Sequence, residues 1–125
     1  MKVAFASING RSLDSHFGQC PSFSIFEFSE KGYKWLESRS VLDRPINGEE
    51  HDKADLRVKV IKDCKLVFVN NIGNDATKKV MKAGIMILKA EEGSELIPHL
   101  EKLLQMLKER PPLWLTKVLY HSEEQ

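Results

Sequence analysis

Apolar residues follow three strand-like patterns within the first 41 residues. Residues 2–7 contain the continuous apolar run Val3-Ala4-Phe5-Ala6, which is typical of a buried strand. Residues 22–28 alternate polar and apolar side chains, as a half-buried strand does, and residues 33–41 predict a third strand. Only Glu30-Lys31-Gly32 separates the second and third strands, so these two are expected to form an antiparallel hairpin.

The middle of the chain alternates between helical and strand patterns. A surface connection is predicted at residues 41–50, because it contains Pro45 and Asn47-Gly48. Strand–helix–strand units pair their strands in parallel through right-handed crossovers. The predicted elements are a helix over residues 49–63 with Ala54, Val58 and Ile61 on its apolar face, a buried strand over 65–70, a helix from Asn74 or Asp75 to Ala83 closed by Gly84, and a strand over 85–88.

The clearest helical pattern covers residues 95–108. Ile97, Leu100, Leu104 and Leu107 form its apolar stripe, with Leu96 and Leu103 alongside. Pro98 fits the first turn and Ser94 is a possible cap, whereas Pro111-Pro112 ends the helix. Residues 111–125 are interpreted as a C-terminal tail in which Trp114 plugs the core. The element order predicts an α/β fold with a mixed five-stranded sheet and helices on its faces.

Composition narrows the class of protein. A chain of 125 residues is expected to form a single domain over residues 1–125. With 19 basic and 18 acidic side chains, the net charge of +1 gives no reason to expect nucleic acid or a membrane surface as a partner. No apolar run approaches the roughly 20 residues that span a bilayer, and no signal-type segment opens the chain, so a cytoplasmic location is expected. Cys20 and Cys64 are too few for a disulfide framework.

Candidate chemistry concentrates between Arg11 and Cys20, directly after the first strand. Loops at the ends of strands are where open α/β sheets tend to place ligands. His16 could offer a neutral imidazole nitrogen to iron, or it could be a surface histidine that caps a turn. Asp14 could orient the His16 ring or accept amide hydrogen bonds within its own turn. Gly18 either lets a ligand approach the backbone or permits a positive φ.

The remaining two side chains of this loop also allow two interpretations. The Cys20 thiolate could be a soft ligand for an iron–sulfur species, or Cys20 could be a small buried hydrophobe. Arg11 would favour an anionic cofactor, or it could be a solvated loop charge. A conventional protein-bound cluster needs about four protein ligands, so a cluster here would keep exposed coordination sites, which suits delivery. Cys64, just before a buried strand, is expected to be structural.

Several motifs resemble the dinitrogenase iron-molybdenum cofactor biosynthesis family, and within it the NifX branch. They are Val3-Ala4-Phe5-Ala6-Ser7 leading into Asp14-Ser15-His16-Phe17-Gly18, the strand Phe23 to Phe28, Arg57 to Cys64, Ile72-Gly73, Ala83-Gly84-Ile85 and Pro111-Pro112-Leu113-Trp114-Leu115. The resemblance implies a ribonuclease H-like fold and a noncatalytic carrier of an iron-sulfur or iron-molybdenum cofactor precursor. It also implies nitrogenase cofactor assembly proteins as partners. In the family pattern His16 is the natural candidate for cofactor contact. The predicted cofactor-binding residues are Arg11, Asp14, His16, Phe17, Gly18 and Cys20, with His16 and Cys20 as the candidate metal ligands.

Three other functions compete with the carrier. A two-metal nuclease needs several acidic residues on the central strands, and residues 2–7 contain none. A Cys20–His16 hydrolase is conceivable, but no oxyanion signature accompanies the pair. The stronger alternative is a noncatalytic regulatory or protein-interaction domain of the same fold that binds no cofactor.

Overall fold

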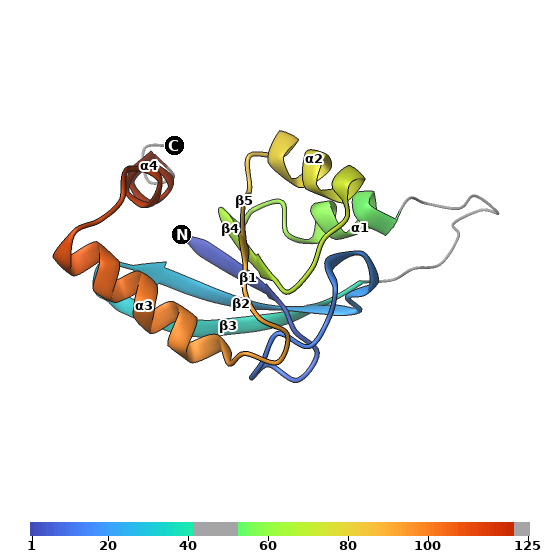
Figure 1. Ribbon diagram of the computed structural model, residues 1–125, viewed down its shortest axis with the longest axis horizontal. Coiled ribbons are helices and arrows are strands. Elements are labelled where there is room, and N and C mark those ends of the chain that lie inside the picture. The colour runs from blue at the N-terminus through green and yellow to red at the C-terminus, as the bar shows by residue number, and fades with distance from the viewer. Residues whose placement is uncertain (42–52, 122–125) are drawn as a thin grey trace.

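The computed structural model describes residues 1–41 and 53–121, and their centre is a mixed five-stranded sheet (Figure 1). The strand order is β3-β2-β1-β4-β5. β1 pairs with β2, and β2 with β3, in antiparallel fashion, whereas β4 is parallel to both β1 and β5. The predicted hairpin and mixed sheet are therefore confirmed. The strands are β1 (Lys2–Ala6), β2 (Ser22–Ser29), β3 (Gly32–Ser40), β4 (Leu66–Val69) and β5 (Met86–Lys89).

Helices follow the order that the sequence predicted, with two additions. The start of the predicted 49–63 helix and nearly all of the 41–50 connection lie outside the described residues. The predicted element order ended with the helix before the two prolines, whereas a further helix begins directly after them, in the segment interpreted as a C-terminal tail. A short 3-10 helix also follows the first loop. The helices are η1 (Phe17–Gln19), α1 (Lys53–Val60), α2 (Asn74–Lys82), α3 (Leu96–Glu109) and α4 (Leu113–His121).

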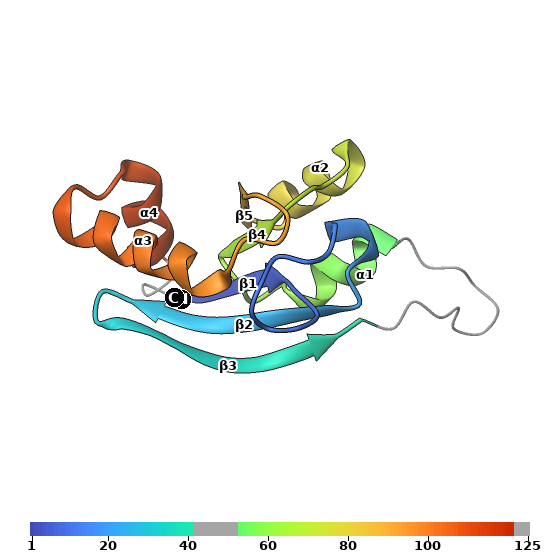
Figure 2. The same ribbon diagram turned by 60° about the horizontal axis from the view of Figure 1, so that its bottom comes forward.

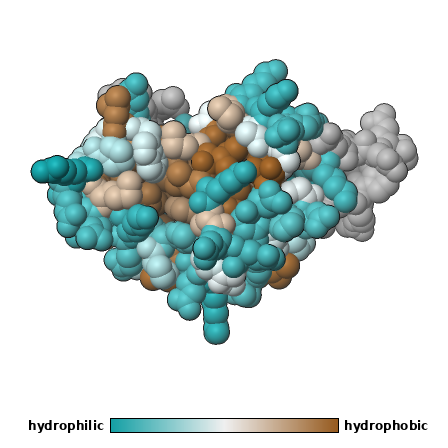
Figure 3. All heavy atoms as spheres, in the orientation of Figure 1, coloured by the Kyte–Doolittle hydropathy of each residue, from teal (hydrophilic) through white to brown (hydrophobic). Residues whose placement is uncertain are grey.

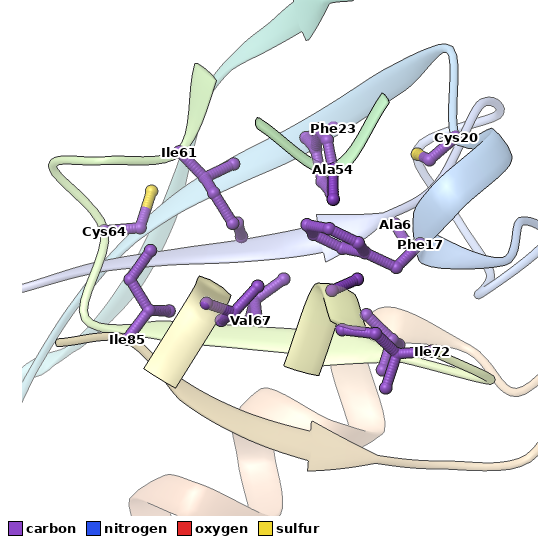
Figure 4. Close-up of a cluster of buried hydrophobic side chains, with 14 of the residues drawn as sticks. Ala6, Phe17, Cys20, Phe23, Ala54, Ile61, Cys64, Val67, Ile72 and Ile85 are labelled. Atoms are coloured by element: carbon purple, nitrogen blue, oxygen red, sulfur yellow. The ribbon is translucent and has the colours of Figure 1, made fainter. Parts of the chain in front are cut away.

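Two hydrophobic clusters lie on the two faces of the sheet, because successive side chains of a strand point to opposite faces. Ala4 and Val67 belong to the cluster beneath α1, α2 and η1, part of which is drawn in Figure 4. Val3 and Leu66, their neighbours in sequence, belong to the cluster beneath α3 and α4. Figure 2 shows α3 and α4 toward one end of the molecule and α1 and α2 toward the other. Each face of the sheet thus has its own helix pair.

The apolar face of α3 is rotated from the one that the sequence predicted. Leu96, Leu100 and Leu103 are buried, whereas Ile97 is 45% exposed, so the placement of Ile97 in the apolar stripe was wrong. The sequence holds two overlapping stripes of nearly equal quality, and docking on the sheet selects one of them. Leu115 of α4 is fully buried in the same cluster.

Trp114 and α1 also differ in detail from the prediction. Trp114 is half-buried at the edge of the α3–α4 cluster, so it is a wall residue instead of the central plug that was predicted. In α1, Ala54 is buried as predicted, but Arg57 is buried as well, and its guanidinium donates a hydrogen bond to the Lys53 carbonyl at 3.1 Å. Val58 is only half-buried.

An ion cluster joins three parts of the chain on the α1 side of the sheet. Both Arg39 terminal nitrogens donate to the Asp63 carboxylate, one of them at 3.0 Å, and the Lys2 ammonium donates to it at 2.9 Å. The Arg39 guanidinium, more than any other group, holds the pKa of Asp63 well below its ordinary value. The segment after α1 is thereby tied to β1 and β3.

Candidate functional site

The candidate loop, residues 7–16, lies where the carboxyl ends of β1, β4 and β5 meet. These three strands are mutually parallel, so their carboxyl ends share one edge of the sheet. The Phe17 amide donates to the Asn71 carbonyl at 3.0 Å, which joins the loop to the segment after β4. The Leu13 amide donates to the Ser94 carbonyl at 2.9 Å, and the Leu96 amide to the Arg11 carbonyl at 2.8 Å. The loop is thus anchored on two sides.

Polar side chains fix the internal shape of the same loop. Asp14 accepts amide hydrogen bonds from Ile8 at 2.8 Å and Asn9 at 3.1 Å, so it takes the amide-accepting role of the two that the sequence left open. The Asn9 side-chain oxygen accepts further amide bonds from Arg11 and Ser12. These bonds satisfy backbone donors that neither strand nor helix pairs, and they hold the loop in one conformation.

His16 stands at the exposed surface of this rigid loop. It occupies the N-cap position of η1, yet its side chain makes no capping hydrogen bond, so the turn-capping interpretation is not supported. Its neighbours Ser15 and Phe17 are both buried, which fixes the backbone on either side of the exposed ring. The backbone therefore presents the His16 side chain at a defined place on the exposed surface.

Phe17 and Cys20 point the other way, into the cluster beneath α1 and α2 (Figure 4). Both side chains are fully buried, and the Phe17 ring lies 5.7 Å from the Phe23 ring. The Cys20 thiol donates a hydrogen bond to the Ser22 carbonyl at 2.7 Å, and burial raises its pKa to about 11. In this conformation the thiol is protonated and enclosed, so a ligand role for Cys20 would require the thiol to leave the core.

Gly18 and the Arg11 side chain are less tightly packed than Phe17 and Cys20. The Gly18 backbone is not left-handed, so the positive-φ explanation for this glycine was wrong. A Cβ added at Gly18 would meet nothing within 4 Å, which leaves open space beside the backbone next to His16. The Arg11 side chain is exposed, while its carbonyl and amide both hold the loop.

Two asparagines after β4 support the loop and were missed by the sequence analysis. The Asn70 side-chain amide donates to the Leu13 carbonyl at 3.2 Å, and the Asn71 carbonyl accepts the Phe17 amide at 3.0 Å. An Asn-Asn pair directly after a buried strand was the available signal, because asparagine is common where a chain turns out of a sheet.

Among residues 1–41 and 53–121, no group of three or more histidine, cysteine, aspartate or glutamate side chains is arranged to hold a metal ion. No described helix is long and apolar enough to cross a membrane.

A second surface feature is an apolar groove along β5. The groove has a volume of about 750 Å³, and among the described residues Lys89 is the only charged one that lines it. Figure 3 shows the corresponding hydrophobic patch between α4 and α2. Its other lining residues are Ile72, Asn74, Thr77, Met81, Gly84, Ile85, Met86, Ile87 and Val118.

Comparison with known proteins gives consistent similarities. Residues 1–106 match the family described as dinitrogenase iron-molybdenum cofactor. Protein NifX of Herbaspirillum seropedicae is 30% identical over 125 residues, which cover 99% of this chain and 85% of that protein. Protein NifY of Azotobacter vinelandii is 29% identical over 125 residues, which cover all of this chain and 50% of that protein.

Two further similarities involve part of a larger protein and a solved structure. The FeMo cofactor biosynthesis protein NifB of Bradyrhizobium diazoefficiens is 33% identical over 84 residues, 66% of this chain but only 17% of that protein. The solved structure titled "Crystal structure of PH0822" superimposes with a TM-score of 0.58 at 21% identity, covering 86% of this chain and 89% of that one. At this identity the superposition supports the fold alone.

Proposed function

This chain belongs to the dinitrogenase iron-molybdenum cofactor family, and we propose that it binds an iron-sulfur or iron-molybdenum cofactor precursor at the His16 loop and passes it on without catalytic turnover. The observation that carries the proposal is an exposed imidazole on a loop that is hydrogen-bonded to two other segments. Nitrogenase cofactor assembly proteins are the proposed donor and acceptor, since relatives bear the names NifX, NifY and NifB.

One exposed imidazole suits a carrier better than a permanent cluster site. Neutral imidazole is a good ligand for iron, and a rigid loop lowers the entropic cost of presenting it. A cluster bound mainly through His16 would keep most of its coordination from its own sulfide and organic ligands. Such a cluster can be transferred by exchanging one protein ligand, whereas a cluster held by four thiolates cannot.

The other loop residues have different parts in this proposal. Asp14 and Phe17 position the loop, because Asp14 binds its amides and Phe17 anchors it in the core. Gly18 leaves room for the cargo beside the imidazole, and the exposed Arg11 is available to an anionic cargo. Cys20 remains a predicted second ligand only if the loop opens.

Anaerobic titration of the purified protein with the cofactor precursor, followed by gel filtration, tests the proposal. His16→Ala should greatly weaken binding, because it removes the coordinating nitrogen. Its thermal stability should change by no more than about 0.5 kcal/mol, because the side chain is exposed.

Gln19→Ala is the matched control, because Gln19 is also exposed and lies in η1, the short helix that begins directly after His16. It should bind the precursor as the unsubstituted chain does. Unchanged affinity in a correctly folded His16→Ala protein would remove His16 from the site and contradict the proposal.

A protein-interaction domain that binds no cofactor is the second candidate function. The observation in its favour is the apolar groove along β5, where Met81 is 65% exposed. In that case an assembly protein would bind the cofactor-free chain, Met81→Glu would abolish that binding, and the precursor would not co-elute with the chain. Co-elution that His16→Ala abolishes would favour the carrier.

Three further expectations also stay predictions. They are the ribonuclease H-like assignment of the five-stranded sheet, the extent of the domain over residues 1–125, and the cytoplasmic location. The strand order and the superposition support an α/β fold of this general kind.

A further inference from the structure

A second cavity lies on the other face of the sheet from Cys20, between β5, α3 and α4. Its volume is about 460 Å³, which is within the range of sites for small organic molecules. Figure 1 shows α3 and α4 on the same side of β5. Ala90, Glu91 and Ser94 of the connection from β5 to α3 also line the cavity. Neither His16 nor any other residue of the loop 7–16 lines this cavity.

Aromatic and aliphatic side chains form the walls. Phe68 of β4 is 5% exposed, and its ring stacks on Phe5 with centroids 4.7 Å apart and planes 8° apart. The His99 ring lies 5.2 Å from the Phe68 ring and is tilted by 32°. The other apolar lining residues are Leu88, Ala90, Leu103, Met106 and Trp114. Aromatic rings from β4, α3 and α4 line the cavity, and they suit a flat aromatic ligand because offset or edge contacts between rings add to simple burial.

Hydrogen bonding fixes the polar face that His99 offers. The Ser94 hydroxyl donates its one proton to the Glu91 carbonyl at 2.7 Å. The 3.0 Å contact between the Ser94 oxygen and His99 Nε2 must then have Nε2–H as the donor. Burial, followed by the nearby Lys102, lowers the pKa of His99, which favours the neutral ring. Neutral His99 with a proton on Nε2 has an acceptor lone pair on Nδ1.

The charges around the cavity favour an anion. Within residues 1–41 and 53–121, the charged side chains that line it are two basic ones, Lys89 and Lys102, and one acidic one, Glu91. Both lysines are exposed, so their ammonium groups can reach the charged end of a ligand whose ring lies deeper in the cavity. A carboxylate or sulfonate on the ring would meet an excess of positive charge.

We propose that the cavity between β5, α3 and α4 binds a small aromatic molecule that carries one anionic group. The ring lies against Phe68 and Trp114, and the anionic group lies at the mouth beside Lys102. The site is separate from the proposed cofactor contact at His16 and does not depend on it.

The probe for a first test is 2-naphthoate, a flat bicyclic ring with one carboxylate. Isothermal titration calorimetry with the full chain should give one saturable site with a Kd on the order of 1 mM or tighter, as expected for a ligand of this size. Amide chemical shifts should move at Ser94, His99 and Lys102 during the titration. The neutral analogue 2-naphthamide should bind a few-fold more weakly, because it lacks the charge.

Two substitutions locate the site, and two others serve as controls. Lys102→Gln should weaken 2-naphthoate about two- to fivefold and remove its advantage over 2-naphthamide, as for an exposed ion pair. Trp114→Leu should weaken both ligands about fivefold, through lost ring contact. The control Lys78→Gln removes an exposed lysine of α2 that does not line the cavity, and it should change nothing. His16→Ala should also leave 2-naphthoate affinity unchanged, which separates this site from the proposed function.

Several results would overturn the proposal. These are the absence of saturable 2-naphthoate binding, equal affinity for the acid and the amide, or shifts confined to the β5 groove around Met81 and Ile87. Because Lys102 is exposed, Lys102→Gln keeps the proposal testable even if Trp114→Leu fails to fold. Unaltered 2-naphthoate affinity in folded Lys102→Gln protein would place the binding elsewhere.

Discussion

The Cys20 thiol offers a direct test of how the candidate loop is built. If the loop keeps the described conformation, Cys20 is an enclosed core residue, and alkylating reagents should not reach it. If the loop opens readily, Cys20 becomes available as a second ligand for a cluster. Treatment of the native protein with iodoacetamide distinguishes the two states.

The expected protection follows from burial and from the thiol pKa. Burial raises the pKa of Cys20 from an ordinary value of 9.0 to about 11. At pH 8 the thiolate fraction therefore falls from about one-tenth to about one-thousandth, and the thiolate is the reactive form. The thiol is also 0% exposed and bonded to the Ser22 carbonyl, so local opening must precede reaction. Alkylation should be slower by at least about 100-fold than in the unfolded chain.

Mass spectrometry of peptides after timed alkylation measures this rate at each cysteine. The reaction in concentrated guanidinium chloride gives the unfolded reference. Cys64 is an internal comparison, because it is 1% exposed and burial raises its pKa to about 12. Rapid native labelling of Cys20 with Cys64 still protected would refute the reasoning and show a loop that opens on its own.

Three other outcomes are expected. The Arg39 guanidinium lowers the pKa of Asp63, so this pair stabilises the fold above about pH 4 and stops doing so as the pH falls further. Since the Asp63 side chain is 47% exposed, Arg39→Gln should cost only about 1 kcal/mol of unfolding free energy at pH 7 and less at pH 2, as measured by urea denaturation. Leu115→Ala should lower the free energy of unfolding by about 2–4 kcal/mol, because Leu115 is fully buried. Leu113→Ala, at a 69% exposed position of the same helix, should change it by no more than about 0.5 kcal/mol. A small effect of Leu115→Ala would contradict the docking of α4. Labelled RNA and DNA should survive incubation with Mg²⁺ or Mn²⁺, because β1 has no acidic residue for a two-metal site; cleavage abolished by one carboxylate substitution would disprove this.

Local sequence determined most of the secondary structure and the place of the candidate loop. The apolar run of β1, the alternation in β2 and the buried run of β4 each specify their elements through short-range periodicity. The short Glu30-Lys31-Gly32 connection specified the hairpin, and strand–helix–strand spacing specified the parallel half of the sheet. Polar and small residues directly after β1 were enough to mark residues 11–20 as the candidate site.

Tertiary structure alone decided which side chains of that loop reach solvent. His16 and Cys20 are four residues apart, yet one is exposed and the other is in the core, because Phe17 and Cys20 pack against a cluster that segments far along the chain complete. Docking likewise chose Leu103 over Ile97 on α3, since both stripes satisfy helical periodicity.

Contacts between distant segments were also beyond the sequence. The Arg39–Asp63 pair joins residues 24 positions apart, and the β5–α3–α4 cavity exists only because α4 packs beside α3. Periodicity reports that a residue has an apolar side, but burial depends on which other element covers that side. The sequence therefore specified the elements and the loop, whereas packing between them determined which atoms a ligand can reach.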